Sequence, residues 1–128
     1  MGVTGIGGIF FRARDPDTLN AWYRHHLGVG SGCSADGAGP PEEWSWGTIG
    51  GPTVFAPFKS DTDYFPADKA YMINLRVTGM DTLLASLRAA DIAVETRAEW
   101  DSPEVGRFAR IHDPENNPIE LWEPHASP

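Results

Sequence analysis

An internal repeat limits the folds that this chain can adopt. Residues 11–24 align without gaps with residues 75–88. The identical pairs are Arg12 with Arg76, Asp17 with Asp81, Thr18 with Thr82, Leu19 with Leu83, Ala21 with Ala85 and Arg24 with Arg88. Self-similarity of this kind indicates one structural unit used twice. The repeat therefore predicts two similar modules within one chain.

Each copy of the repeat begins with a strand pattern and continues with a helical one. In the first copy, residues 8–13 alternate in polarity as a strand does. Asp15 is the expected N-cap of the following helix, Pro16 its first residue and Gly28 its stop signal. The apolar residues that recur with a helical period are Leu19, Trp22, Tyr23 and Leu27.

The second copy follows the same order, with a strand at 71–77 and a helix that carries Met80, Leu83, Leu84 and Leu87. Short strand patterns separated by turn residues follow each helix. They lie at 43–49 and 53–58 in the first copy and at 92–97, 107–112 and 118–123 in the second. We therefore predict an α+β fold of two βαβββ modules. Module one spans about 6–60, the linker about 61–69 and module two about 70–124, within a single domain 1–128.

Composition excludes several classes of protein. The 128 residues suit one domain, and the formal charge of -8 disfavours a nucleic-acid partner because phosphates would be repelled. No apolar run is long enough to span a bilayer, and the N-terminus lacks the pattern of a signal peptide. The single cysteine, Cys33, forms no internal disulfide and lies in a loop pattern, away from any His or Lys that would activate it. We expect a cytoplasmic protein without a membrane partner.

Several features together resemble the vicinal oxygen chelate superfamily, which contains glyoxalase I, ring-cleaving dioxygenases and bleomycin-resistance proteins. They are the duplicated unit, the aromatic pair Trp22–Tyr23, the Leu27–Gly28 helix end and the closing stretch "DPENNPIELWEP". The resemblance covers nearly the whole chain. It implies strands that curve into an open barrel around a central cleft, with a homodimer completing the architecture.

The closing strand places a carboxylate in an apolar pattern. Glu120 and Trp122 share one face of this strand, and Ile119 and Leu121 share the other. If Ile119 and Leu121 pack under the helices, Glu120 faces the cleft, where a buried charge needs a partner. The same alternation turns further residues of the first strands toward the cleft: Phe10, Arg12, Met72, Asn74 and Arg76. Either arginine is a candidate partner of Glu120, in a structural ion pair or in a binding site.

The metal-ligand positions of the family are mostly lost. The resemblance implies ligands from the first and last strands of both modules, and these positions fall on Gly8, Met72, Phe55 or Ala56, and Glu120. A divalent ion needs several His, Glu or Gln side chains that converge, and one carboxylate does not hold it. We therefore predict no metal and no other cofactor.

The histidines do not restore the metal site. His25 and His26 fall near the end of the first helix, where a cation interacts favourably with the helix dipole. His125 belongs to the tail and has no predicted role. His112 lies beside the closing turn, on the strand face of Arg110, and is either a turn residue or a ligand contact.

The sequence also supplies aromatic residues for a pocket wall, although such residues often form the core instead. The candidates are Phe10, Trp44, Trp46, Phe55 or Phe58, and Trp122. Glu120 is the predicted catalytic residue. The predicted ligand-binding residues are Phe10, Arg12, Trp46, Phe55, Met72, Asn74, Arg76, His112 and Trp122.

Several functions remain open on these residues. The first is a metal-independent protein that binds a small, partly apolar molecule, as the bleomycin-resistance branch does. The second is a glyoxalase-like lyase or isomerase with Glu120 as general base and Arg12 or Arg76 stabilising an enolate or carboxylate. A divalent-metal-dependent lyase or dioxygenase with ligands outside the family pattern is a further alternative. The last is a module whose dimer surface matters more than its cleft.

Overall fold

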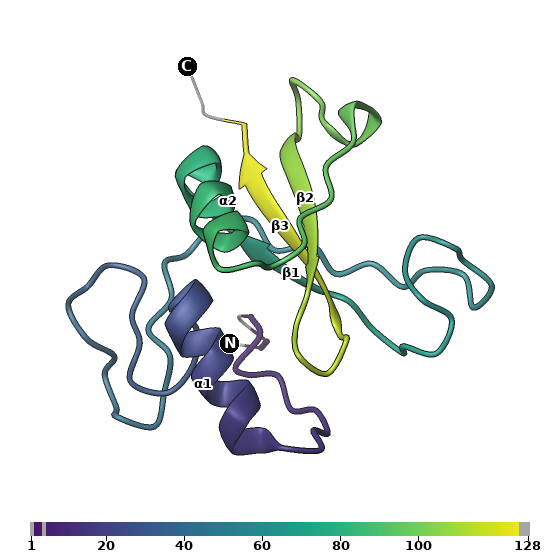
Figure 1. The fold of residues 1–128 in the computed structure, drawn as a ribbon. Helices are drawn as coiled ribbons and strands as arrows, with labels where there is room; N and C mark the ends of the chain where they lie inside the picture. Colours follow the sequence, from purple (N-terminus) through teal and green to yellow (C-terminus); the bar gives the residue numbers. More distant parts are fainter. Residues whose placement is uncertain (1, 4, 126–128) are drawn as a thin grey trace.

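The computed structural model describes residues 2–3 and 5–125. Two α-helices, one 3-10 helix and three strands in one small sheet form its regular structure (Figure 1). In chain order the elements are α1 (Pro16–Leu27), β1 (Ile73–Arg76), α2 (Met80–Ala89), the 3-10 helix η1 (Ala98–Trp100), β2 (Gly106–His112) and β3 (Pro118–Pro124).

The sheet has the order β1-β3-β2, so that the last strand of the described chain lies in the middle. β1 runs parallel to β3, and β2 runs antiparallel to it. In this register Glu120 lies between Asn74 on one side and Arg110 on the other. Because residues opposite each other in a sheet share a face, these three side chains form a row across it.

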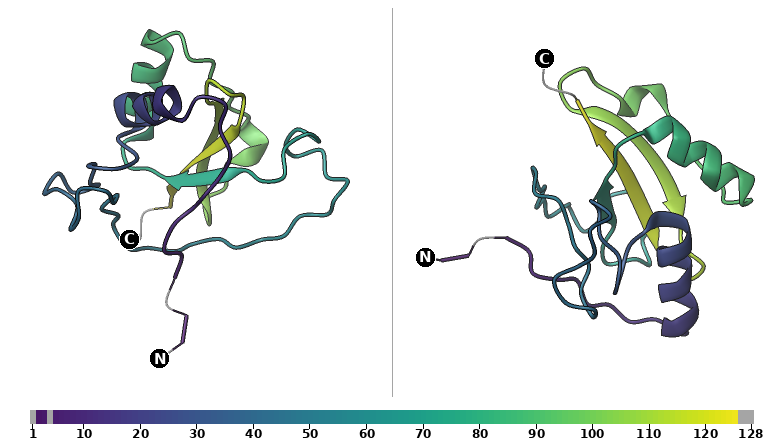
Figure 2. Two further views of the ribbon diagram at one scale, coloured as in Figure 1. Left: turned by 90° about the horizontal axis from the view of Figure 1, so that it is seen from below. Right: turned by 90° about the vertical axis from the view of Figure 1, so that its left-hand side faces the viewer.

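The helices cover one face of the sheet, and the extended segments of the first half lie on the other side (Figure 2). The core is formed between the helices and the sheet by Leu19, Tyr23, Met80, Leu84, Leu87, Ala109, Ile111, Ile119 and Leu121. Ile119 and Leu121 are fully buried there. The predicted faces of the closing strand are therefore confirmed, and Glu120 and Trp122 belong to the face away from the helices.

The predicted signals of the first helix are confirmed. The Asp15 carboxylate accepts hydrogen bonds from the Thr18 backbone N–H at 3.1 Å and from its hydroxyl at 2.7 Å. Pro16 is the first residue of α1, where its missing N–H is no loss. Gly28 ends the helix in the left-handed conformation, with φ of 65°, and donates its N–H to the Arg24 carbonyl.

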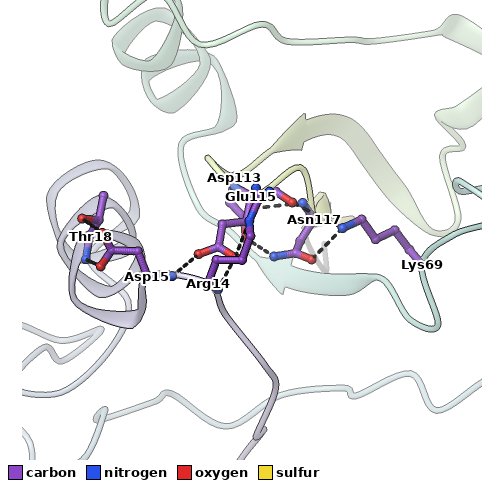
Figure 3. A network of polar contacts seen from close by, with 7 residues as sticks. All are labelled: Arg14, Asp15, Thr18, Lys69, Asp113, Glu115 and Asn117. Carbon is purple, nitrogen blue, oxygen red and sulfur yellow. Dashed lines mark hydrogen bonds and ion pairs between the residues drawn. The ribbon is translucent and has the colours of Figure 1, made fainter.

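The turn between β2 and β3 is organised by the buried carboxylate of Asp113 (Figure 3). One oxygen accepts hydrogen bonds from the backbone N–H groups of Glu115 at 2.9 Å and Asn117 at 3.0 Å. The other accepts from the Tyr23 hydroxyl and the Asn117 side-chain amide, both at 2.8 Å. Burial and then the bond to Asp113 raise the pKa of Tyr23 well above its usual range. The turn thus holds α1 against the sheet.

The same turn also binds two segments outside the second module. The Glu115 carboxylate accepts hydrogen bonds from the backbone N–H groups of Arg14 at 2.6 Å and Asp15 at 2.9 Å, and these lower the pKa of Glu115. The Lys69 ammonium donates to the Glu115 carbonyl at 3.3 Å and to Asn117 at 3.4 Å (Figure 3). The turn therefore joins the start of α1 and the linker to the second half of the chain.

The first half of the chain differs from the predicted strand pattern. Segments 8–13, 43–49 and 53–58 form no strand, and Gly47 makes only an isolated bridge with Ser34. Segment 92–97 is likewise reduced to a bridge between Glu95 and Arg110. A strand needs a neighbour for its backbone groups. Within the described chain, segments 8–13 and 53–58 pair with no strand, and the backbone hydrogen bonds of segment 43–49 to another segment go only to residues 32–35. The described residues therefore do not form two complete βαβββ modules.

We expect Tyr23→Phe to lower the free energy of unfolding by about 1.5–3 kcal/mol, the range for a hydrogen bond to a charged group. The reason is that the ring stays in the core while Asp113 loses a donor. Urea unfolding followed by circular dichroism measures the effect.

Tyr71→Phe is the matched control, because Tyr71 is more exposed than Tyr23. Substitutions at such surface positions usually change the free energy of unfolding by less than about 0.5 kcal/mol. Equal losses in the two variants would contradict a special role for the Asp113 turn.

Candidate functional site

A row of polar side chains crosses the sheet face that points away from the helices, which we call the open face. Glu120 is only 8% exposed there. One of its oxygens accepts a hydrogen bond from the Asn74 side-chain amide at 2.8 Å, and the other accepts a short hydrogen bond from the Tyr64 hydroxyl. Two neutral donors thus hold this carboxylate.

The predicted arginine partners of Glu120 are wrong. Arg76 instead donates to the backbone carbonyls of Pro52 at 2.6 Å and Ile49 at 2.8 Å. A Cβ at Gly51 would come within 2.9 Å of the Arg76 Nε, so the guanidinium lies directly against the backbone at Gly51. Arg12 is exposed to solvent. Arg76 therefore binds the first-half segment to the edge of the sheet, which leaves it unavailable to a carboxylate.

Arg110 is the second buried charge of the open face, with 7% of its surface exposed. Its guanidinium lies against two rings, 5.0 Å from the centroid of Tyr64 and 5.6 Å from that of Trp100. It donates one hydrogen bond to the Tyr64 carbonyl at 3.0 Å, and its buried Nε has no hydrogen-bond partner among the described residues. Among the described residues Arg110 and Glu120 form no ion pair, although they are cross-strand neighbours.

Tyr64 connects the two buried charges. It comes from the 61–69 linker and packs against Phe58 and Trp100 with ring centroids 5.6 and 6.4 Å apart. Burial and then the hydrogen bond to Glu120 raise the pKa of Tyr64 to about 12. The linker is therefore part of the site as well as a connection between the two halves.

The aromatic candidates take different positions. Trp122 is buried, stacks on Phe108 with centroids 6.3 Å apart and donates its indole N–H to the Val105 carbonyl at 2.9 Å. By contrast, Phe10 is 97% exposed and Phe55 is 88% exposed, and Trp44 and Trp46 are also exposed. Among the described residues no aromatic pair connects these four to Trp122. The predicted wall is thus not closed within one chain.

The two remaining ligand-binding candidates, Met72 and His112, lie at the end of the sheet where β1 and β3 begin. Met72 is half-buried next to the start of β1. His112 ends β2, is exposed, and pairs in register with Pro118, so its position beside the turn is confirmed. Partial desolvation and then the Arg110 guanidinium lower the pKa of His112. It is therefore expected to be neutral at pH 7.

Two solved structures resemble the chain over almost its full length. The crystal structure of TnmS3, an antibiotic binding protein from Streptomyces sp. CB03234, has a TM-score of 0.55 and 20% sequence identity, covering 97% of this chain and 98% of its own. A glyoxylase/bleomycin resistance protein/dioxygenase domain from Frankia sp. EAN1pec has a TM-score of 0.55 and 19% identity, covering 97% and 100%.

The chain has the glyoxalase/bleomycin-resistance/dioxygenase fold. The resemblance inferred from the repeat and the closing motif is confirmed at this level. No family model and no curated protein matches the sequence. Within residues 2–3 and 5–125, no helix is long and apolar enough to cross a membrane.

The open face does not fit the metal site of this fold family. Over the described residues, no group of three His, Cys, Asp or Glu side chains is placed to hold a metal ion. Glu120 is the single carboxylate of the row, and its oxygens face an amide and a phenol. A divalent ion would need further anionic or imidazole ligands, which these neighbours do not supply.

Two surface hollows lie away from the polar row. A hollow of about 860 Å³ is lined by Val77, Pro103, Glu123 and their neighbours at the end of β3, and it is widely open to solvent. A smaller one of about 400 Å³ lies between α2 and β2, where Arg107 pairs with Asp81 at 2.8 Å. We place the candidate site on the open face instead, because the buried and incompletely paired charges are there.

Of the predicted site residues, Asn74 and Glu120 lie in the polar row, whereas Tyr64, Trp100 and Arg110 were not among the predicted candidates. Arg110 carries a usable signal, since it alternates with Phe108 and His112 on a strand next to Glu120. Tyr64 and Trp100 lie in irregular or 3-10 segments, where no periodicity indicates which way a side chain points.

The raised pKa of Tyr64 predicts a loss of stability at alkaline pH. An unfolded tyrosine titrates near 10, whereas Tyr64 in the folded protein titrates near 12. Such a group contributes stability that is fully present below the unfolded pKa and is lost as pH rises through the folded one. The free energy of unfolding measured with urea should therefore fall between about pH 10 and 12, and it should fall less steeply in Tyr64→Phe. Identical slopes would show that the pKa of Tyr64 is not raised in the folded protein.

Proposed function

We propose that this protein binds a small, partly apolar organic molecule on the open face without a metal ion. The observation that supports this most is the pair of buried charges that do not neutralise each other. Glu120 relies on neutral donors, and the Arg110 Nε has no hydrogen-bond partner. Burying such groups costs free energy, and protein folds retain such costs mainly at functional sites.

The surroundings of the charges suit an organic ligand. Phe58, Tyr64, Trp100, Phe108 and Trp122 supply flat apolar surface near them. Binding sites for small molecules typically combine such surface with a few placed polar groups. TnmS3, which shares the fold, is named as an antibiotic binding protein, and this supports a binding role here.

The enzymatic alternatives have less support in the geometry. As a general base, Glu120 would need a free oxygen within reach of the substrate proton. Asn74 contacts one of its oxygens, and Tyr64 contacts the other as long as Tyr64 stays in place. A metal-dependent lyase or dioxygenase would need ligands that the described residues do not bring together. We therefore retain binding as the proposed activity.

We expect a screen of small organic molecules by NMR to shift the amide resonance of the Asn74 side chain and the indole resonance of Trp122. Compounds that bind should also raise the melting temperature, because a ligand bound only to the folded state stabilises it. A chelator such as EDTA should change neither result. Shifts confined to the hollow around Val77 and Pro103, or a melting temperature lowered by the chelator, would contradict the proposal.

We also propose that the protein is a homodimer in which the second copy covers the first-half segments. This chain exposes 9248 Å². A folded monomer of its mass is expected to expose only about 6700 Å². The excess is larger than the roughly 800 Å² that each partner buries in a standard interface. It includes Phe10 and Phe55, whose extended segments lack strand partners in the described chain. A large exposed apolar surface typically marks such an interface.

Sedimentation velocity at micromolar concentration is expected to give a dimer for the native chain. Phe10→Asp combined with Phe55→Asp should give a monomer, because the charges would be buried at the interface. Ala85→Asp, at an exposed position of α2 on the opposite side of the sheet, is the matched control and should remain dimeric. A monomeric native protein would contradict this proposal.

A further inference from the structure

We propose that the open face takes a planar aromatic molecule with a phenolic hydroxyl, and that Tyr64 occupies the place of this ligand when none is bound. The inference rests on the proposed binding function and adds the chemical class of the ligand. It also assigns to Tyr64 the role of an internal competitor. The geometry that supports it is the set of contacts that one tyrosine makes with both buried charges.

Tyr64 contacts the two buried charges of the open face as a phenol would. Its hydroxyl donates to the Glu120 carboxylate, and its ring lies 5.0 Å from the Arg110 guanidinium carbon. Its carbonyl, which belongs to the backbone, accepts a hydrogen bond from Arg110 at 3.0 Å. A hydroxyl donor, a flat π surface and an oxygen acceptor are thus the features that the two charges require.

The fit of Tyr64 is nevertheless incomplete. The Arg110 Nε keeps no hydrogen-bond partner, although Arg110 is more than nine-tenths buried. An unsatisfied buried donor costs free energy that a better-placed acceptor would recover. A ligand with an oxygen at the edge of its ring can supply this acceptor, whereas the tyrosine ring carries its single oxygen toward Glu120. The site therefore has a reason to prefer a ligand over its own side chain.

Tyr64 is also placed to leave. The segment around it forms only local turns, such as the Thr62 N–H bonded to the Lys59 carbonyl and the Lys69 N–H bonded to the Pro66 carbonyl. Tyr64 itself is half-buried. Within the described chain, the hydrogen bonds between segment 61–66 and the sheet are those of Tyr64 with Glu120 and Arg110. Replacing these contacts with those of a ligand would release the segment without unfolding the sheet.

Charge disfavours ligands that carry a single positive or negative charge. A cationic ligand would meet the Arg110 guanidinium beside Glu120, and like charges in a buried site repel strongly. An anionic ligand placed on Arg110 would meet Glu120 in the same way. A neutral hydroxyarene avoids both conflicts, because it donates to the carboxylate and presents its negative π face to the arginine.

The hydroxyl part of the proposal is tested by calorimetric titration with two probes that have no further ring oxygen. They are 2-naphthol and 2-methoxynaphthalene, which has the same rings but no hydroxyl donor. Tyr64→Phe should bind 2-naphthol about tenfold more tightly than the native protein, because the competing hydrogen bond to Glu120 is removed and the open state is more populated. Tyr71→Phe is the matched control and should bind as the native protein does. In Tyr64→Phe, 2-methoxynaphthalene should bind at least about tenfold more weakly than 2-naphthol.

Two further measurements keep the test decisive. Glu120→Gln in the Tyr64→Phe background should reduce the preference for 2-naphthol, because a neutral amide is a weaker acceptor than a carboxylate. Tyr64→Ala should be destabilised, and p-cresol, which is the missing side chain, should raise its melting temperature more than 4-methylanisole does. The native protein should gain less from p-cresol, since its own Tyr64 fills the place.

The outcomes separate this inference from the proposed function. If the two naphthalenes bind Tyr64→Phe equally on the open face, the phenol class is wrong, while the binding function stands. If Tyr64→Phe gains no affinity over the native protein, Tyr64 is not a competitor and the inference fails. If neither probe binds any variant and no screened compound shifts open-face resonances, the binding function and the inference fail together.

Discussion

The carboxylate of Asp113 is the interaction on which most of the architecture depends. It accepts four hydrogen bonds at a single turn, and these fix the β2–β3 hairpin and hold Tyr23 of α1 over the sheet. Through Glu115 the same turn reaches the residues that begin α1. A buried charge with this many donors is well solvated by the protein. One short turn thus connects the repeat copies, which otherwise share few polar contacts.

The buried charges of the open face, unlike Asp113, are incompletely paired. Its two charges lie on neighbouring strands yet remain separate, and Tyr64 stands between them as donor, stacking surface and acceptor. Where Asp113 is fully satisfied, Arg110 is not. Such a contrast within one sheet separates a group that serves the fold from groups suited to binding. The proposed ligand class follows from the hydroxyl donor and aromatic ring that Tyr64 supplies, and from the Arg110 Nε that Tyr64 leaves without an acceptor.

Much of this arrangement could be predicted from local pattern. Asp15, Pro16 and Gly28 marked the limits of α1 because capping chemistry depends on neighbouring residues. The alternation of Ile119 and Leu121 correctly turned Glu120 to the open face. Its partner was predicted wrongly because Arg76 and Asn74 share that face, and the choice between them depends on the path of residues 49–52. The first-half segments carry a strand pattern, but nothing in that pattern shows that they fail to form strands. Strand pairing depends on a neighbour rather than on the segment itself.

The order of the sheet also constrains how the chain acquires its structure. β1 and β2 both pair with β3 and not with each other, yet β3 follows both of them in the sequence. During synthesis the two outer strands and both helices therefore leave the ribosome before the strand that unites them. Until β3 arrives, the apolar faces of α1 and α2 lack the centre of the sheet that they cover, and such exposed surface favours aggregation. The sheet order therefore makes the last part of the described chain the part that completes the core.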